Sequence, residues 1–367
     1  MERQFLKGCE AIAESAVRAG CRFYAGYPIT PQNEIPEYFA RRMPEVGGVY
    51  LQGESEVASV NMVYGAAGGG TRCMTSSASC GISLKAEGMS YMAMARVPAV
   101  VLNAQRGGPG VGDIRPAQQD YFQATKALGN GGFQYIVLAP STIQEAADMT
   151  YEAFDLADKY RNPVMVLTDG FTAAMMEPVV LPEQKSEEEL AAIKAAKKAD
   201  WALKGKVEGQ PLHKISFNAG SKPPQGKFMN TGEDRNKTDA AMYELWKEEE
   251  VRYEEYRLDN AEVVIAAYGV AARISATAIN ILRAEGYKVG MIRPIRVNPF
   301  PEKPYAALDP AKVKGILVVE HSIPSQMIYD VKLATGNTIQ IDTCLRSCGE
   351  IISRDQIVED VKKIFAK

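Results

Sequence analysis

The sequence predicts an α/β protein with two parallel-sheet domains. Short, continuously apolar stretches alternate with stretches of helical periodicity over residues 1–178 and again over residues 258–367. Strands that are buried on both faces of a parallel sheet have this pattern. A polar segment, 179–257, separates the two regions and contains runs of charge such as 187–189. Such runs are typical of solvated helices and loops, so we expect a connector with no folded domain of its own.

Each region has elements that can be placed along the chain. In the first region, helices are expected over residues 9–19, 56–67, 84–95 and 143–159, and strands over 23–27, 72–75, 98–103, 135–139 and 164–168. Gly20 follows the first helix, where a C′ glycine commonly ends a helix. In the second region, strands are expected over 262–267, 288–292, 315–320 and 338–342, with helices over 271–285 and 325–334.

Composition and charge exclude several classes of function. The net charge of -3 provides no basic surface for phosphates, so we expect no nucleic-acid partner. No apolar run approaches the roughly 20 residues that a membrane helix needs, and the sequence opens on a helix-like pattern instead of a signal peptide. We therefore expect a cytoplasmic protein with no membrane segment. The six cysteines are scattered, which argues against a disulfide framework and places any iron–sulfur cluster on another chain.

The two histidines give little support for histidine chemistry. His213 lies in the polar segment, where we expect it at the surface. His321 follows the expected strand 315–320, at the end of a strand where α/β sheets place ligands. A functional and a structural role both stay open for His321. The sequence favours neither a Ser-His-Asp triad nor a histidine metal site.

A first motif, YPITPQ, occupies residues 27–32. Pro28 and Pro31 fix the φ angle at their own positions and bias Tyr27 and Thr30 away from helical conformation. Such a turn would hold the Thr30 hydroxyl in one place. Alternatively, Thr30 only caps the helix that is expected to follow.

A second motif, QGESEVAS, occupies residues 52–59. Glu56 begins an expected helix of small residues, against which another element can pack closely. A carboxyl group at this position, pressed into apolar surroundings, is expected to be able to share a proton. The alternative is a surface glutamate that the helix dipole favours.

A third motif, QRGGPGVGD, occupies residues 105–113 and follows an apolar strand. Arg106 at the end of this strand, beside a glycine loop that permits close approach, is well placed to bind a carboxylate through two hydrogen bonds. The glycines do not match a phosphate-binding P-loop, because no Gly-Lys-Ser/Thr follows. A plain loop with an arginine ion pair is the alternative.

In this order, the three motifs resemble the α-type subunits of the 2-oxoacid:ferredoxin oxidoreductases. The resemblance extends over nearly the whole chain and is closest to the large subunit of the branched-chain, or 3-methyl-2-oxobutanoate (2-ketoisovalerate), enzymes. Segments 26–37, 74–83 and 120–126 carry that closer match. The resemblance implies a thiamine-diphosphate pyrimidine-binding domain over residues 1–178 and a transketolase-C-terminal-like domain over residues 258–367.

The resemblance also implies an activity and site residues. The activity is oxidative decarboxylation of a 2-oxoacid to acyl-CoA and CO₂, with coenzyme A as co-substrate and ferredoxin as electron acceptor. Glu56 matches the glutamate that protonates N1′ of thiamine diphosphate, Thr30 the threonine that touches the substrate, and Arg106 the arginine that holds its carboxylate. Tyr27 and Arg115 are further expected substrate contacts, and Pro28 and Ile29 are expected cofactor contacts.

The partners follow from what the chain lacks. Thiamine enzymes hold the diphosphate and its metal with a Gly-Asp-Gly motif, which this sequence does not contain; Asp169 and Gly170 are expected to form a turn. The resemblance therefore implies a β subunit with the diphosphate and Mg²⁺, so that the cofactor is shared between subunits. It also implies a γ-type subunit, a ferredoxin-like δ subunit with [4Fe-4S] clusters, external ferredoxin, and a dimer of heteromers.

The loop after the third motif bears on the substrate. Relatives that use 2-oxoglutarate have hydroxyl residues there, whereas this chain has Gly110, Val111 and Ile114, which suits a branched aliphatic side chain. Arg115 could instead pair with the distal carboxylate of 2-oxoglutarate, and an aryl 2-oxoacid is a further alternative. Two other classes stay open: a thiamine-dependent decarboxylase or transketolase-like subunit that passes no electrons, and a non-catalytic assembly partner.

Overall fold

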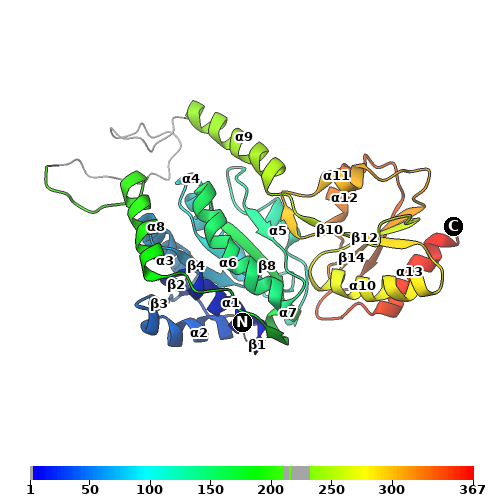
Figure 1. The fold of residues 1–367 in the computed structure, drawn as a ribbon, viewed down its shortest axis with the longest axis horizontal. Helices are drawn as coiled ribbons and strands as arrows, with labels where there is room; N and C mark the ends of the chain where they lie inside the picture. Colours follow the sequence, from blue (N-terminus) through cyan, green and yellow to red (C-terminus); the bar gives the residue numbers. More distant parts are fainter. Residues whose placement is uncertain (1–2, 210–214, 216–231) are drawn as a thin grey trace.

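The continuously apolar stretches form the centres of two separate sheets in the computed structural model, which describes residues 3–209, 215 and 232–367. Figure 1 shows the two sheets in two domains side by side, with the C-terminus at the far end of the second domain. Most strand pairs in both sheets are parallel. The predicted fold class, an α/β protein with two parallel-sheet domains, is confirmed.

The first sheet has the strand order β13–β7–β8–β5–β4–β2–β3, with β6 paired to β5. Only β13 and β6 run antiparallel to their neighbours in this sheet. The strands are β2 (Phe23–Gly26), β3 (Val49–Gln52), β4 (Cys73–Ser77), β5 (Val100–Gly107), β6 (Asp113–Pro116), β7 (Ile136–Leu138), β8 (Val164–Asp169) and β13 (Arg296–Asn298). A separate antiparallel pair joins β1 (Gln4–Lys7) to β9 (Met176–Val179).

Helices cover both faces of this sheet. On one face are α1 (Gly8–Arg18), α2 (Glu34–Arg42) and α6 (Ile143–Tyr160); on the other are α3 (Glu56–Gly68) and α4 (Cys80–Met94). In β5, Val100 and Leu102 are buried on the face covered by α1, α2 and α6, and Val101 is buried on the face covered by α3 and α4. Successive residues are thus buried on opposite faces. Burial on both faces explains why the strand is apolar throughout. Short helical segments η1 (Pro44–Val46), α5 (Tyr121–Thr125) and α7 (Gly170–Ala174) lie in the connections.

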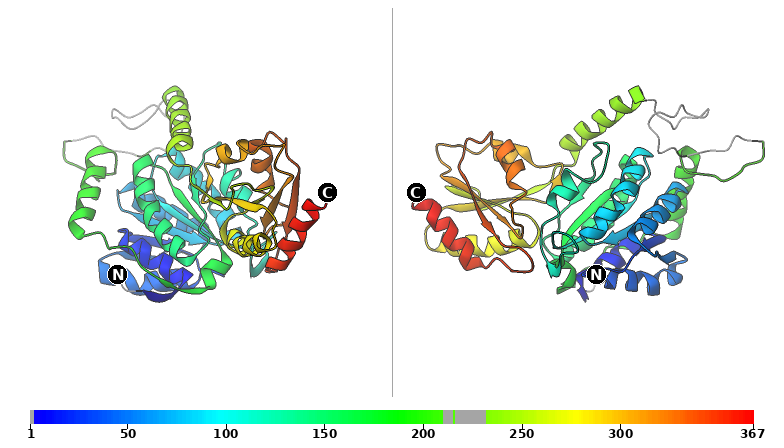
Figure 2. Two further views of the ribbon diagram at one scale, coloured as in Figure 1. Left: turned by 45° about the vertical axis from the view of Figure 1, so that its right-hand side comes forward. Right: turned by 180° about the vertical axis from the view of Figure 1, so that it is seen from behind.

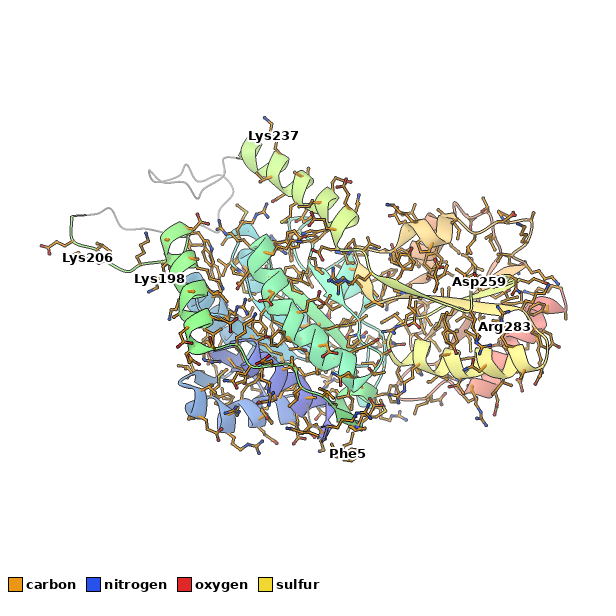
Figure 3. The ribbon with its side chains drawn as sticks, viewed as in Figure 1. Phe5, Lys198, Lys206, Lys237, Asp259 and Arg283 are labelled. Atoms are coloured by element: carbon orange, nitrogen blue, oxygen red, sulfur yellow. The ribbon has the colours of Figure 1, made fainter. Side chains whose placement is uncertain are left out.

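The second sheet has the strand order β10–β12–β11–β14–β15, and only β10 runs antiparallel to its neighbour. Its strands are β10 (Tyr253–Tyr256), β11 (Val263–Ala266), β12 (Val289–Pro294), β14 (Gly315–Glu320) and β15 (Ile341–Leu345). Helices α10 (Gly269–Ala284) and α13 (Arg354–Phe365) pack on one face, and α11 (Glu302–Ala306) and α12 (Ile328–Ala334) pack on the other. Figure 3 shows Asp259 and Arg283 near each other in this domain, and Arg283 Nη2 donates to the Asp259 carbonyl at 3.3 Å.

The segment expected as a connector, 179–257, contains helices α8 (Glu187–Asp200) and α9 (Gly232–Glu249) and strand β10. Figure 2 shows α8 and α9 on the outside of the first domain. Trp201, which follows α8, and Trp246 of α9 are both buried against its cores. Because β10 pairs with β12, the end of this segment also belongs to the second sheet. The division of the chain at residues 178 and 257 stays a prediction.

Strand pairing and a shared buried carboxylate are among the contacts that join the domains. Strand β13, which follows the second domain's β12, pairs with β7 at the edge of the first sheet. The buried carboxylate of Asp169 accepts from the backbone N–H groups of Thr172 at 2.8 Å and Val270 at 2.9 Å. Asp169 therefore caps the start of α7 in the first domain and of α10 in the second, where the sequence predicted only a turn.

We expect the buried charge of Glu250 to be a large contributor to stability. Glu250 is buried and pairs with the buried Arg296 of β13, and it accepts from Tyr160 Oη at 2.5 Å. Glu250→Ala leaves a buried guanidinium short of a partner and should lower the free energy of unfolding by about 3–5 kcal/mol. Urea unfolding of the chain measures this. The matched control is Glu249→Ala, because the Glu249 side chain is 46% exposed; less than about 1 kcal/mol is expected. Equal losses would contradict the assignment.

Candidate active site

Four chain segments, three of which carry the sequence motifs, meet at the carboxyl edge of the first sheet. Strand β2 lies between β3 and β4, so the chain first connects to one side of β2 and then crosses to the other. Such a reversal leaves a crevice at the carboxyl ends of the strands, where α/β proteins bind ligands. Thr30 follows β2, Glu56 follows β3, Ser79 follows β4, and Arg106 lies at the end of β5.

Arg106 is buried and lies against the turn that contains Thr30. Its Nη1 donates to the Thr30 carbonyl at 3.0 Å, and its Nη2 donates to the Val111 carbonyl at 2.6 Å and contacts Cys80 Sγ at 3.2 Å. Its Nε has no hydrogen-bond partner. Within the described part of the chain, no carboxylate forms an ion pair with Arg106. A buried guanidinium with a free donor and no directly paired carboxylate is suited to bind an anionic ligand.

A buried polar network fixes the backbone around Arg106. Ser79 has a φ angle of 30°, which is strained for a residue with a side chain. Its Oγ donates to Asp120 Oδ2 at 2.5 Å and accepts from the Arg106 N–H at 3.0 Å, and Asn103 Nδ2 donates to the same Asp120 oxygen at 3.1 Å. Burial raises the pKa of Asp120 to about 6. The sequence reasoning assigned no role to these residues, although segments 74–83 and 120–126 were singled out.

Glu56 is the first residue of α3 and is only 6% exposed. The helix is capped by Ser55, whose Oγ accepts from the Ala58 N–H at 3.1 Å. A Cβ atom on Gly81 would lie 2.7 Å from Glu56 Oε1 and would collide with Ser77 Oγ, so the glycine lets the carboxyl group lie against the start of α4. The expected burial is confirmed, and the alternative of a surface glutamate is wrong.

Glu56 and Arg106 approach the start of α4 from two sides. Glu56 contacts Gly81, and Arg106 contacts the adjacent Cys80. No hydrogen bond joins the Glu56 carboxylate to another described residue. The structure therefore brings together the two residues with opposite charge that the motifs predicted. It leaves one carboxyl group and one guanidinium donor available for ligands.

The turn after β2 is more exposed than Arg106 and Glu56. Tyr27 is 37% exposed, Pro28 is exposed, and Ile29 and Thr30 are half-buried. The residue that caps α2 is Asn33, so the alternative that Thr30 only caps this helix is not what the structure has. Asn33 Nδ2 instead lies 3.5 Å from Thr30 Oγ1.

Gln32 anchors the same turn and was missed by the sequence reasoning. Its side chain is fully buried, accepts from Ser76 Oγ at 2.5 Å and donates to the Tyr27 carbonyl at 3.4 Å. Ser76 belongs to β4, so Gln32 ties the motif turn to the neighbouring strand. Nothing in the local pattern distinguishes this glutamine from a surface residue.

Arg115 lies outside this cluster. Its side chain is 58% exposed and forms an ion pair with Asp113, with Nε at 2.9 Å and Nη2 at 2.6 Å from Oδ2. The Arg115 guanidinium holds the pKa of Asp113 below its usual value. The charge of Arg115 is thus already compensated, which weakens the case for a clamp on a second substrate carboxylate.

His321 is a buried link between the domains. Its Nε2 accepts from the Ile352 N–H at 3.1 Å, and its Nδ1 lies 3.3 Å from Gln118 Oε1. Burial lowers the pKa of His321 to about 4, so the ring is neutral near pH 7 and carries its proton on Nδ1. The structural alternative for His321 is therefore favoured. His213 lies outside the described residues.

The described residues contain no group of three or more His, Cys, Asp or Glu side chains that could hold a metal ion. The six cysteines are all free thiols. None of the helices in the described ranges is long and apolar enough to cross a membrane.

Comparison with known proteins identifies the family. The family model "Pyruvate flavodoxin/ferredoxin oxidoreductase, thiamine diP-bdg" matches residues 14–256, and "Pyruvate:ferredoxin oxidoreductase core domain II" matches residues 261–357. The ketoisovalerate oxidoreductase subunit VorB of Methanothermobacter thermautotrophicus is 40% identical over 99% of this chain and 98% of its own length. The 2-oxoglutarate synthase subunit KorA of Methanocaldococcus jannaschii is 35% identical over 90% of this chain and 92% of its own.

A solved structure shares the fold. The 2-oxoglutarate:ferredoxin oxidoreductase of Magnetococcus marinus superposes with a TM-score of 0.83 at 24% identity, over 99% of this chain and 65% of that longer chain. The resemblance predicted from the three motifs is confirmed by the family models and by the relatives that match the chain from end to end. The chain belongs to the 2-oxoacid:ferredoxin oxidoreductase family and is one subunit of such an enzyme.

Proposed function

We propose that this chain is the α-type subunit that provides the pyrimidine half of a thiamine diphosphate site, in an enzyme that oxidises branched-chain 2-oxoacids to acyl-CoA and CO₂. The observation that carries the proposal is the placement of a buried carboxyl group and a buried guanidinium with an unpartnered Nε on two sides of the Cys80–Gly81 turn. One can serve the cofactor and the other can serve the substrate.

Glu56 fits the pyrimidine of thiamine diphosphate. When bound, this cofactor supplies a nucleophilic carbon that attacks the keto group and takes up the electrons left when CO₂ departs. The Glu56 carboxyl is buried, held by a capped helix and free of hydrogen bonds from the described residues, so it can hold a proton between its oxygen and N1′. Pro28 and Ile29, on the adjoining turn, are the proposed apolar contacts of the cofactor.

Arg106 and Thr30 fit the 2-oxoacid. The free Nε of Arg106 can donate to the substrate carboxylate, while Nη1 and Nη2 hold the guanidinium plane against the Thr30 and Val111 carbonyls. Because the guanidinium is fixed on both sides, little side-chain entropy is lost when the acid binds. Thr30 and Tyr27, beside it, are the proposed contacts with the rest of the substrate.

The branched-chain acid is the better supported substrate. Gly110, Val111 and Ile114 follow the arginine in the chain and offer no hydroxyl or charged side chain, and Arg115 is paired with Asp113. The relative with 40% identity is a ketoisovalerate oxidoreductase subunit, whereas the 2-oxoglutarate synthase subunit is 35% identical. The 2-oxoglutarate alternative is therefore weaker. An aryl 2-oxoacid has no specific observation in its favour.

Exposed apolar residues around the crevice support a partner subunit. Tyr27, Val57, Leu84, Val111 and Ile114 are all large, apolar and exposed. Tyr27, Val57 and Val111 lie within the three motifs, Leu84 lies in α4 and Ile114 lies in β6. Clustered exposure of this kind marks a surface that another protein covers. We assign this surface to the β subunit that carries the diphosphate and Mg²⁺. We further propose a γ-type subunit and a δ subunit with [4Fe-4S] clusters, assembled into a dimer of heteromers. External ferredoxin would accept the electrons, coenzyme A would accept the acyl group, and the enzyme would be cytoplasmic.

Methyl-viologen reduction by the purified anaerobic complex tests this function. With thiamine diphosphate and coenzyme A present, we expect 3-methyl-2-oxobutanoate to have a kcat/KM about tenfold above 2-oxoglutarate, pyruvate or an aryl 2-oxoacid, since a pocket of small apolar residues separates such acids by about 1–3 kcal/mol. A preference for 2-oxoglutarate would restore Arg115 as a substrate contact. Decarboxylation without viologen reduction would favour a thiamine enzyme that passes no electrons.

A further inference from the structure

Lys85 is a fully buried lysine on the face of α4 that packs against α3. Gly81, Lys85 and Gly88 are spaced four and three residues apart and therefore lie on one face of the helix. A Cβ atom on Gly81 would lie 2.7 Å from Glu56 Oε1, and one on Gly88 would lie 2.5 Å from Val60 Cγ1. Both glycines thus contact α3, and Lys85 lies between them. Figure 1 shows α3 and α4 side by side on the first sheet.

The lysine is held by one hydrogen bond. Its Nζ donates to Thr75 Oγ1 at 2.8 Å, and Thr75 in turn donates to the Ala25 carbonyl at 2.7 Å. Ala25 belongs to β2, which leads directly into the turn that contains Thr30. Within the described residues Lys85 has no ion pair within 4 Å. An ammonium group has three donors, so this group is only partly satisfied.

The charged group that interacts electrostatically with Lys85 is the Glu56 carboxylate. Burial lowers the pKa of Lys85 from the ordinary 10.5 to about 7, and the opposing influence comes from the Glu56 carboxylate. From β4, the neutral hydroxyl of Thr75 accepts the hydrogen bond of the lysine. Among the described residues, Glu56 is thus the one ionisable group whose charge acts on the lysine. A lysine needed for packing alone would be better replaced by an apolar side chain of similar length.

We propose that Lys85 is a positioning residue that acts through Glu56 and sets how readily this carboxyl group gives its proton to N1′ of the thiamine pyrimidine. The inference rests on the function proposed above for Glu56. The charged ammonium stabilises the Glu56 carboxylate and so favours transfer of the proton from Glu56 Oε to N1′. The neutral amine has no such effect. Lys85 keeps its own proton throughout, and no bond to it is made or broken.

Exchange of the thiamine C2 hydrogen for deuterium tests the proposal without turnover. The assembled complex is transferred to D₂O with no 2-oxoacid, quenched with acid, and the cofactor is read by NMR. Because Lys85 is charged mainly below its pKa of about 7, we expect Lys85→Met to slow exchange about tenfold near pH 6 and less than about twofold near pH 8.5. In a Glu56→Gln background the Lys85→Met change should have no further effect.

The outcomes distinguish the role of Lys85 from that of Glu56. A loss that is the same at all pH values, or that persists with Glu56→Gln, would assign Lys85 a merely structural role and leave Glu56 intact. If Glu56→Gln itself does not slow exchange, both assignments are overturned. Should Lys85→Met fail to assemble, Thr75→Val keeps the lysine but removes its acceptor. This variant should move the pH dependence to lower pH by about half a unit to one unit; an unmoved dependence would contradict the proposal.

The protonation of Lys85 also has a readout that needs no cofactor. A base whose pKa is lower when folded binds fewer protons than the unfolded chain between pH 7 and 10.5. The free energy of unfolding of the wild-type chain should therefore rise with pH across this window. In Lys85→Met this contribution to the pH dependence is absent. We expect the Tm advantage of Lys85→Met to shrink as the pH rises from 7 to about 10. A constant Tm difference would show that Lys85 stays charged, and would overturn the expected pH window.

Discussion

Glu56→Gln is expected to lower 2-oxoacid-dependent viologen reduction by the assembled complex by about two to four orders of magnitude. The amide has the size of the carboxyl group, so the packing against Gly81 should be kept. An amide cannot give a proton to N1′, however, and the pyrimidine then loses its acid partner. The rate is measured with saturating 3-methyl-2-oxobutanoate and thiamine diphosphate, so that weaker cofactor binding does not enter the comparison.

The matched control is Glu54→Gln in the same motif. Glu54 lies two residues before Glu56 but is exposed, and its side chain forms no hydrogen bond with the described residues of the crevice. We expect its activity to stay within about twofold of the wild type, as for most surface substitutions. If Glu56→Gln were as active as Glu54→Gln, the chain would be an assembly partner with no catalytic residue, the alternative that the sequence left open.

Thr30 and Arg106 could be predicted because each lies at the end of an apolar strand. Parallel strands align their carboxyl ends, so these two residues were expected at one edge once the strands before them were recognised. The strands that precede Thr30 and Arg106 are apolar enough to be read directly from the sequence. The placement of Glu56 needed only the start of a small-residue helix, and the structure has α3 begin at that residue.

The supporting residues could not be predicted, because their roles come from contacts between distant segments. Ser79, Asn103 and Asp120 meet only after β4, β5 and the loop before α5 are assembled. Lys85 reads locally as an ordinary helical lysine. The one available signal was its spacing from Gly81 and Gly88, which places it on the helix face with the closest packing.

The missed elements of the fold have a similar origin. Strand β3 is an edge strand whose Val49 and Leu51 are exposed, so it lacks the continuous burial that marks β5. Strand β13 has three residues and is defined by pairing with β7 from the other domain. The last strand was expected at 338–342 but begins at Ile341, because Gly336 and Asn337 form a turn with positive φ angles directly before it.

Arg106→Lys is expected to lower kcat/KM for 3-methyl-2-oxobutanoate about 100-fold, which corresponds to about 3 kcal/mol, mainly by raising KM. Lysine keeps the positive charge but has no Nε donor and no planar fork. It cannot hold the Thr30 and Val111 carbonyls and a substrate carboxylate at the same time. A loss of kcat with unchanged KM would instead place Arg106 in the chemical step and contradict its assignment to carboxylate binding.

Arg115→Met tests whether the charge of Arg115 contributes to substrate binding. Arg115 is exposed and paired with Asp113, so kcat/KM for 3-methyl-2-oxobutanoate should stay within about twofold of the wild type. With 2-oxoglutarate the same variant decides the remaining substrate question. If Arg115 leaves Asp113 to bind the distal carboxylate, activity with this acid should fall selectively, by about tenfold or more. If both acids are affected equally, Arg115 shapes the loop that carries Val111, and the choice of substrate depends on the apolar residues around Arg106.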